Sequence, residues 1–129
     1  MTAFLFDTHL LLWSAAGDPR LSRGAARLLT DGVSQRLFSP ISLAEVAIKY
    51  AKRRADFSFP PGALHAGLLA NGFHELPLTS RHSAALLDLP DLHGDPFDRL
   101  LVAQAIAEGL TLVTSDALLG RYSGRVMVV

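Results

Sequence analysis

The sequence contains no cysteine, and this absence excludes several classes of site. Disulfide bonds, zinc sites built from thiolates and cysteine nucleophiles are all ruled out together. An excess of charge of one sign is also lacking, because 12 basic residues balance 12 acidic residues. The chain therefore has no global field of the kind that drives indiscriminate binding to nucleic acids, and a local patch must meet any polyanion.

Long apolar runs are missing as well. The apolar stretches are far shorter than the roughly 18 to 20 residues that a membrane span needs, and no charged-then-apolar leader precedes Phe4. We therefore expect a soluble, cytoplasmic protein. Its 129 residues, 50% of them hydrophobic, fit one domain over residues 1–129 with a substantial core.

What the chain does contain is an alternation of short apolar runs and helical patterns. Runs typical of buried strands occupy residues 4–6, 37–39, 73–76, 111–113 and 126–128. Helices are predicted over residues 9–16, 22–29, 42–54, 63–70, 80–87 and 97–107. This alternation predicts an α/β fold of three layers, with a mostly parallel central sheet of about four to five strands flanked by helices.

Two acidic residues follow predicted strands. Asp7 comes directly after residues 4–6, and Asp116 comes shortly after residues 111–113. Because sites in open parallel sheets form outside the carboxyl ends of the strands, we expect both carboxylates at one edge. The simpler alternative for the first of them is that Asp7, or Thr8, only caps the following helix.

Two further acidic residues lie in the first turns of predicted helices. Glu45 is three residues after Ser42, a spacing that also matches a capping box. Asp98 is three residues after Asp95, where an acidic N-cap and a following proline are an equally ordinary helix start. Each residue taken alone therefore has a capping interpretation.

Together, the four carboxylates favour a metal site. Converging at the strand ends, they would repel one another and raise each other's pKa values without a compensating cation. Mg²⁺ or Mn²⁺ suits such a set, because these ions prefer oxygen ligands and no cysteine is present. One or two such ions can activate water and stabilise the leaving oxygen of a phosphodiester. The implied chemistry is metal-assisted phosphodiester hydrolysis.

Four segments of the chain resemble a known family. Residues 5–13, 42–45, 93–105 and 111–116 are similar to the motifs of PIN-domain ribonucleases, and most of all to VapC-type toxins of bacterial toxin-antitoxin pairs. The likeness covers nearly the whole chain in the right order and is weakest over residues 56–77. It implies a metal-dependent endoribonuclease toxin, neutralised by a cognate antitoxin and assembled as a homodimer.

The resemblance also implies roles for individual residues. The family's four acidic, catalytic positions, which hold Mg²⁺ or Mn²⁺, fall on Asp7, Glu45, Asp98 and Asp116. Asp95 is ambiguous, either a helix cap or an auxiliary ligand or water-holder, and we favour a cap with a role outside the ligand set. Three hydroxyl residues are expected to orient the ligands or a water molecule: Thr8, Thr114 and Ser115.

Basic and histidine residues give weaker signals. Lys49, Lys52 and Arg53 follow Glu45 on the predicted helix, so they can contact RNA or the antitoxin. An ordinary Glu45–Lys49 pair on a solvated face is the alternative. The histidines show no metal-ligand spacing, and His9 and His93 are interpreted as a local hydrogen-bonding residue and a loop residue.

Two other functions remain open from the sequence. One is a phosphotransfer domain in which Asp7 acts as the nucleophile. This alternative is disfavoured because the chain has no second aspartate two residues after Asp7 and no lysine after the strand that ends near Asp116. The other is a non-catalytic binding module, which the presence of all four acidic residues disfavours.

Overall fold

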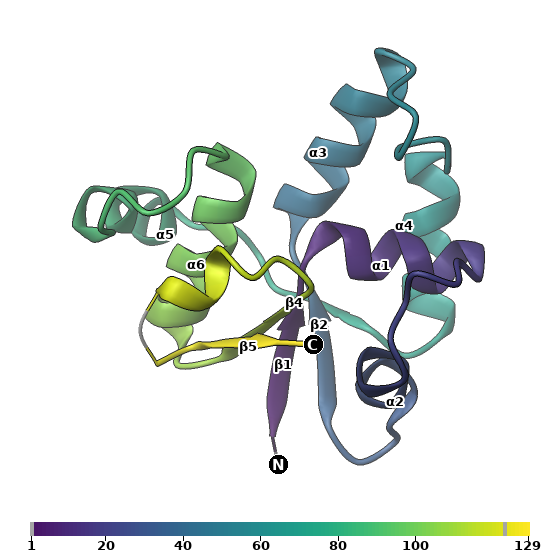
Figure 1. Ribbon diagram of the computed structural model, residues 1–129, viewed down its shortest axis with the longest axis horizontal. Coiled ribbons are helices and arrows are strands. Elements are labelled where there is room, and N and C mark those ends of the chain that lie inside the picture. The colour runs from purple at the N-terminus through teal and green to yellow at the C-terminus, as the bar shows by residue number, and fades with distance from the viewer. Residues whose placement is uncertain (1, 123) are drawn as a thin grey trace.

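The computed structural model describes residues 2–122 and 124–129, and their centre is a five-stranded sheet (Figure 1). All neighbouring strands are parallel, in the order β3-β2-β1-β4-β5. The strands are β1 (Ala3–Phe6), β2 (Gln35–Phe38), β3 (His74–Glu75), β4 (Thr111–Thr114) and β5 (Val126–Val128). The predicted α/β class with a parallel sheet is confirmed.

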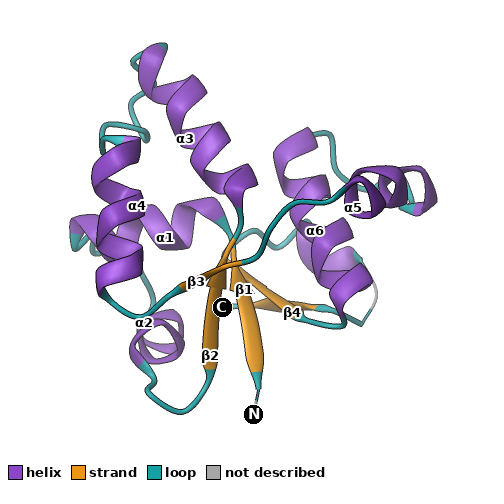
Figure 2. Ribbon diagram, turned by 180° about the vertical axis from the view of Figure 1, so that it is seen from behind, coloured by secondary structure: helices purple, strands orange, loops and turns teal. Residues whose placement is uncertain are grey.

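Helices cover both faces of this sheet (Figure 2). The α-helices are α1 (Thr8–Ala16), α2 (Arg23–Thr30), α3 (Pro40–Ala51), α4 (Pro61–Ala70), α5 (Ser80–Ala84) and α6 (Pro96–Glu108). Two short 3₁₀ helices are η1 (Ala85–Asp88) and η2 (Leu119–Arg121). Helices α1, α2 and α4 lie on one side, and α5 and α6 lie on the other.

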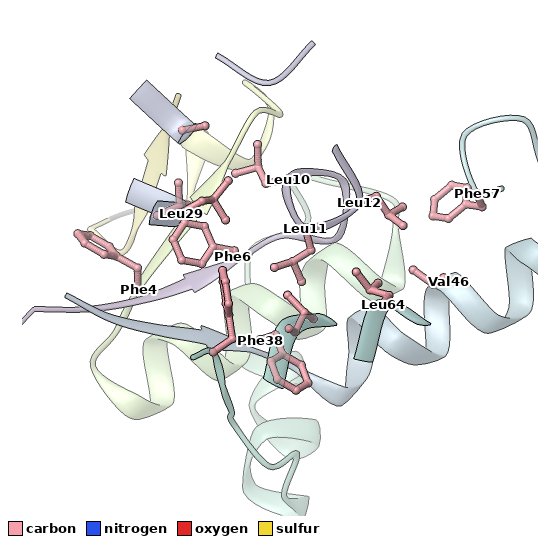
Figure 3. Packing of buried hydrophobic residues seen from close by; sticks show 14 residues of the cluster. Phe4, Phe6, Leu10, Leu11, Leu12, Leu29, Phe38, Val46, Phe57 and Leu64 are labelled. Carbon is pink, nitrogen blue, oxygen red and sulfur yellow. The ribbon is translucent and has the colours of Figure 1, made fainter. Parts of the chain in front are cut away.

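Alternation along β1 produces a separate core on each face. Successive side chains of a strand point to opposite faces, so Phe4 and Phe6 join one buried cluster and Leu5 joins the other. The first cluster includes the apolar side of α1, with Leu10 and Leu11 (Figure 3). The second cluster holds α6 against the sheet. Because β1 is packed on both faces, its position in the sheet is fixed, and so is the position of Asp7, which follows it.

The carboxyl ends of β1 and β4 lie side by side. Phe6 pairs with Val113, and the Asp7 N–H donates to the Val113 carbonyl at 3.0 Å. Helix α6 leads into β4 through a short connection, so its amino-terminal end lies toward the same edge of the sheet. Asp7, Asp116 and the start of α6 are thereby brought to one edge.

The start and end of α3 differ from the prediction. The helix begins at Pro40 rather than Ser42, because Ser39 is the N-cap and its hydroxyl accepts from Ile41 N at 3.1 Å. Ser42 is buried and accepts a hydrogen bond of 3.0 Å from the Thr8 hydroxyl. The capping box of Ser42 and Glu45 is therefore wrong. Helix α3 also ends at Ala51, short of residue 54.

Within the described residues, none of the helices combines the length and apolar character that crossing a membrane would require.

Candidate metal centre

Asp7 is buried between β1 and α1, with only 3% of its surface exposed. It is the N-cap of α1, since Oδ1 accepts from Leu10 N at 3.0 Å, while Oδ2 accepts from the Thr114 hydroxyl. Burial raises the pKa of Asp7, and the bond from Thr114 opposes this. The capping alternative holds for Asp7 rather than for Thr8, and it uses one of the two carboxylate oxygens.

Thr114 links the ends of β1 and β4. Its buried hydroxyl donates to Asp7 and accepts from Asp116 N at 3.0 Å. Asp116 in turn accepts from Leu118 N through Oδ1 at 2.9 Å. One threonine therefore connects two of the predicted acidic residues. Ser115 contributes a backbone hydrogen bond that lowers the pKa of Asp7, and the predicted role of its hydroxyl stays a prediction.

Asp95 and Asp98 occupy the start of α6. Asp95 is the N-cap, because Oδ1 accepts from Phe97 N at 2.9 Å and from Asp98 N at 3.5 Å. Burial raises the pKa of Asp98 to about 7, with further contributions from the negative charges of Asp95, Glu45 and Asp7. The carboxylates at the strand ends are thus close enough to act on one another.

Glu45 reaches the site from the second turn of α3 and is 2% exposed. Its Oε2 accepts from Lys49 Nζ at 2.6 Å. Its Oε1 is buried and has no hydrogen-bond partner among the described residues. A buried carboxylate oxygen left in this state is unfavourable. The charge of Glu45 also raises the pKa of Asp98.

His93 belongs to the site, although the sequence indicated only a loop position. The ring lies in the loop before α6, with Nε2 at 2.9 Å from Asp116 Oδ2 and 3.8 Å from Asp98 Oδ2. One ligand atom from each of these three residues lies within 4.8 Å of the others. The usable signal was a histidine two residues before an acidic N-cap. His9 instead packs its ring against Trp13 and Phe57.

The predicted basic residues divide between two places. Lys49 lies beside the site, where Nζ binds Glu45 and stands 4.8 Å from the Phe57 ring centroid. Lys52 caps the end of α3, and Arg53 follows with a left-handed backbone, φ 54°. The helical face that carries Glu45 and Lys49 therefore does not extend to Lys52 and Arg53. Arg53 lines a cavity of about 570 Å³ beyond the helix, together with Tyr50, Arg54 and Phe57 among others.

The structure brings all four predicted acidic residues to one edge of the sheet by two kinds of link. Thr114 connects Asp7 to Asp116 by hydrogen bonds, and electrostatic repulsion couples Glu45 and Asp7 to Asp98. This arrangement can bind a hard cation, and the assignment of each residue as a ligand stays a prediction.

Comparison with known proteins supports the fold. Ribonuclease VapC22 of Mycobacterium tuberculosis is 32% identical over 117 residues, covering 90% of this chain and 88% of the relative. Among solved structures, VapBC2 from Rickettsia felis, bound to a DNA fragment from its promoter, is similar with a TM-score of 0.71 and 19% identity. That match covers 99% of this chain and 98% of the other.

A second solved structure has the same fold. VapC20 of Mycobacterium tuberculosis, described as a Sarcin-Ricin loop cleaving toxin, has a TM-score of 0.62 and 20% identity, covering 91% of this chain and 92% of the other. The PIN domain family matches residues 4–124. This chain therefore belongs to the PIN domain family, and its identity to Ribonuclease VapC22 groups it with the VapC proteins of that family.

Proposed function

We propose that this protein is a metal-dependent endoribonuclease that acts in the cytoplasm as the toxin of a toxin-antitoxin pair. The observation that carries the proposal is the group of Asp7, Glu45, Asp98 and Asp116 at the strand ends of a PIN domain. The names of the relatives support it, because one is a ribonuclease and another a toxin that cleaves the sarcin-ricin loop.

The residues present fit a divalent cation. Glu45 Oε1 is buried and has no hydrogen-bond partner in the described part of the chain, and Asp98 has a pKa raised to about 7 by burial and neighbouring carboxylates. Lys49 compensates only Glu45 directly, so negative charge remains in excess. Mg²⁺ or Mn²⁺, held by the four carboxylates, would balance that charge. When bound, the ion supplies activation of water and stabilisation of charge on the phosphodiester.

The surrounding residues hold the carboxylates in place before any ligand arrives. Thr114 fixes one oxygen of Asp7, and the cap of α1 fixes the other. The hydroxyl bond between Thr8 and Ser42 ties the end of β1 to α3, which carries Glu45. Such support matters because a catalytic constellation must be held to within about half an ångström.

The RNA strand would pass from the carboxylates toward the end of α3. Lys49 stands beside Glu45, and Arg53 lines the cavity beyond the helix. Lys52 and Arg53 are exposed and take part in no salt bridge within the described residues. With balanced charge over the whole chain, these residues are the local patch that a polyanion needs.

An antitoxin and a second copy of the chain are the proposed protein partners. The similar Rickettsia felis structure is VapBC2 bound to a DNA fragment from its promoter, and a similar Klebsiella pneumoniae structure is a toxin-antitoxin complex. Exposed apolar side chains on α3 and α4, Ile48, Tyr50 and Leu69, offer surface for a protein contact.

The phosphotransfer alternative fits this structure less well. Asp7 is 3% exposed, and both of its oxygens already accept hydrogen bonds. A carboxylate held in this way has little freedom to attack a phosphoryl group.

The test is cleavage of a single-stranded or hairpin RNA by the purified full chain. We expect no cleavage in EDTA and restored cleavage on addition of Mg²⁺ or Mn²⁺. Cleavage that continues at an equal rate in EDTA would contradict the metal dependence. Transfer of phosphate to the protein, without RNA cleavage, would favour the phosphotransfer alternative.

A further inference from the structure

His93 lies with Asp98 and Asp116 in the group of close potential ligand atoms, where it is the one imidazole. Both ring nitrogens contact polar atoms. Nδ1 accepts from the backbone N–H of Asp95 at 3.1 Å, and Nε2 lies 2.9 Å from Asp116 Oδ2. The side chain is 11% exposed, so water competes little for either contact. The two partners therefore decide which nitrogen carries the hydrogen.

The backbone contact fixes the tautomer of the ring. A backbone N–H can only donate, so Nδ1 must present its lone pair to Asp95. In a neutral imidazole the hydrogen then sits on Nε2, which donates to the Asp116 carboxylate. A nitrogen that carries a hydrogen has no lone pair for a metal ion. Binding a metal through Nε2 would move the hydrogen to Nδ1, against the Asp95 N–H.

Asp116 is the residue that gains from this contact. Its side chain is 37% exposed, compared with 19% for Asp98, so little packing restrains it. Leu118 N holds Oδ1 at 2.9 Å, and His93 holds Oδ2 on the side that faces Asp98. The ring thereby joins the loop before α6 to the turn after β4.

We propose that His93 is a positioning residue of the metal centre, donating from Nε2 to Asp116 and remaining outside the ligand set. The inference rests on the proposed function for the role of Asp116. It leaves the ligands all oxygen, which favours Mg²⁺ and Mn²⁺ over later transition metals that prefer imidazole. A nitrogen ligand at the same place would shift that preference.

The first test uses the metal-free protein and is independent of activity. The ¹⁵N chemical shifts of the His93 ring, assigned by their loss in His93→Ala, should report hydrogen on Nε2 and none on Nδ1. A ring with hydrogen on Nδ1 would overturn the proposal. This result does not depend on whether the protein cleaves RNA, so it separates the two proposals.

The second test measures Mn²⁺ affinity by calorimetry in four proteins. We expect His93→Ala to weaken binding by about tenfold, as is typical for removal of a partner of a metal ligand. His93→Gln can return an N–H donor and should recover most of the affinity. His74→Ala, at an exposed strand residue away from the site, should bind like the wild type. Equal loss in His93→Ala and His93→Gln would contradict a donor role.

Pulsed electron paramagnetic resonance of Mn²⁺ in the wild type completes the test. We expect no nitrogen coupling of the strength produced by a directly bound imidazole. Such a coupling, lost in His93→Ala, would make His93 a ligand and overturn the proposal. If the wild type bound no Mn²⁺ at all, the proposed function would fail, while the ¹⁵N measurement would still judge the tautomer.

Discussion

At the scale of single residues, Asp98 is a carboxyl whose pKa is raised well above its ordinary value. Burial raises its pKa to about 7, and the charges of Asp95, Glu45 and Asp7 add to the effect. A cation bound near Asp98 would offset the repulsion from these three carboxylates. A carboxyl with a raised pKa also destabilises the folded protein once it ionises.

The raised pKa of Asp98 predicts how the stability of the metal-free protein varies with pH. Between about pH 4 and pH 7 the folded state keeps a proton on Asp98 that the unfolded state has lost, so stability should fall as pH rises through that window. Asp98→Asn removes the effect. Because Asp98 is partly hydrated, we expect the variant to be more stable by about 2 kcal/mol at pH 8 in EDTA, with little difference at pH 4.

Urea denaturation at the two pH values measures this difference. Asp88→Asn changes an exposed aspartate on η1 and is the control, expected to match the wild type at both. A loss of stability in Asp98→Asn at pH 8 would show that the Asp98 carboxylate stabilises the metal-free fold, contrary to the account.

At the scale of the elements, helix starts decide where the acidic side chains lie. Asp95 caps α6 with its side chain, and its backbone N–H holds His93. Asn caps helices as well as Asp, whereas Ala does not. Comparing Asp95→Asn with Asp95→Ala therefore separates the role of Asp95 as a helix cap from the role of its charge.

We expect Asp95→Asn to keep the stability of the wild type and most of its Mn²⁺ affinity. Asp95→Ala should lose about 1 kcal/mol through the missing cap. Thermal unfolding and calorimetry give both values. A large fall in Mn²⁺ affinity in Asp95→Asn, with stability unchanged, would instead place the Asp95 carboxylate among the ligands.

Most of the secondary structure could be predicted from the sequence, whereas contacts between distant residues could not. Apolar runs and helix stops predicted the five strands and the six α-helices of the described residues, but not the 3₁₀ helix η2 or the division of residues 80–88 into α5 and η1. The rule that sites form at strand ends correctly predicted that Asp7 and Asp116 share one edge of the sheet. The start of α3 was wrong because Ser39 and Ser42 both suit a cap, and the choice depends on the distant partner Thr8. His93 was missed for a similar reason, since its contact with Asp116 spans two loops.

At the scale of the whole molecule, balanced charge predicts that the proposed RNA binding depends on one region. Arg53 lies at the end of α3, with a left-handed backbone and a cavity of about 570 Å³ beside it. Because asparagine tolerates that backbone conformation, Arg53→Asn removes the charge without adding strain. The substitution therefore tests the charge alone.

In the Asp98→Asn background, in which we expect no cleavage, Arg53→Asn should weaken RNA binding and reduce its dependence on salt. Loss of one phosphate contact should lower the slope of log affinity against log salt by about 0.7. Fluorescence anisotropy at several salt concentrations measures the slope. Arg23→Gln, on exposed α2, is the control, and an equal effect there would assign the change to general charge.

The single-turnover rate of Asp98→Asn decides whether the proposed carboxylate site carries out RNA cleavage. We expect the rate to fall at least about a thousandfold in Mg²⁺ or Mn²⁺, while the variant stays folded and gains stability without metal. Asp88→Asn should cleave like the wild type. Cleavage by Asp98→Asn at the wild-type rate would contradict the account.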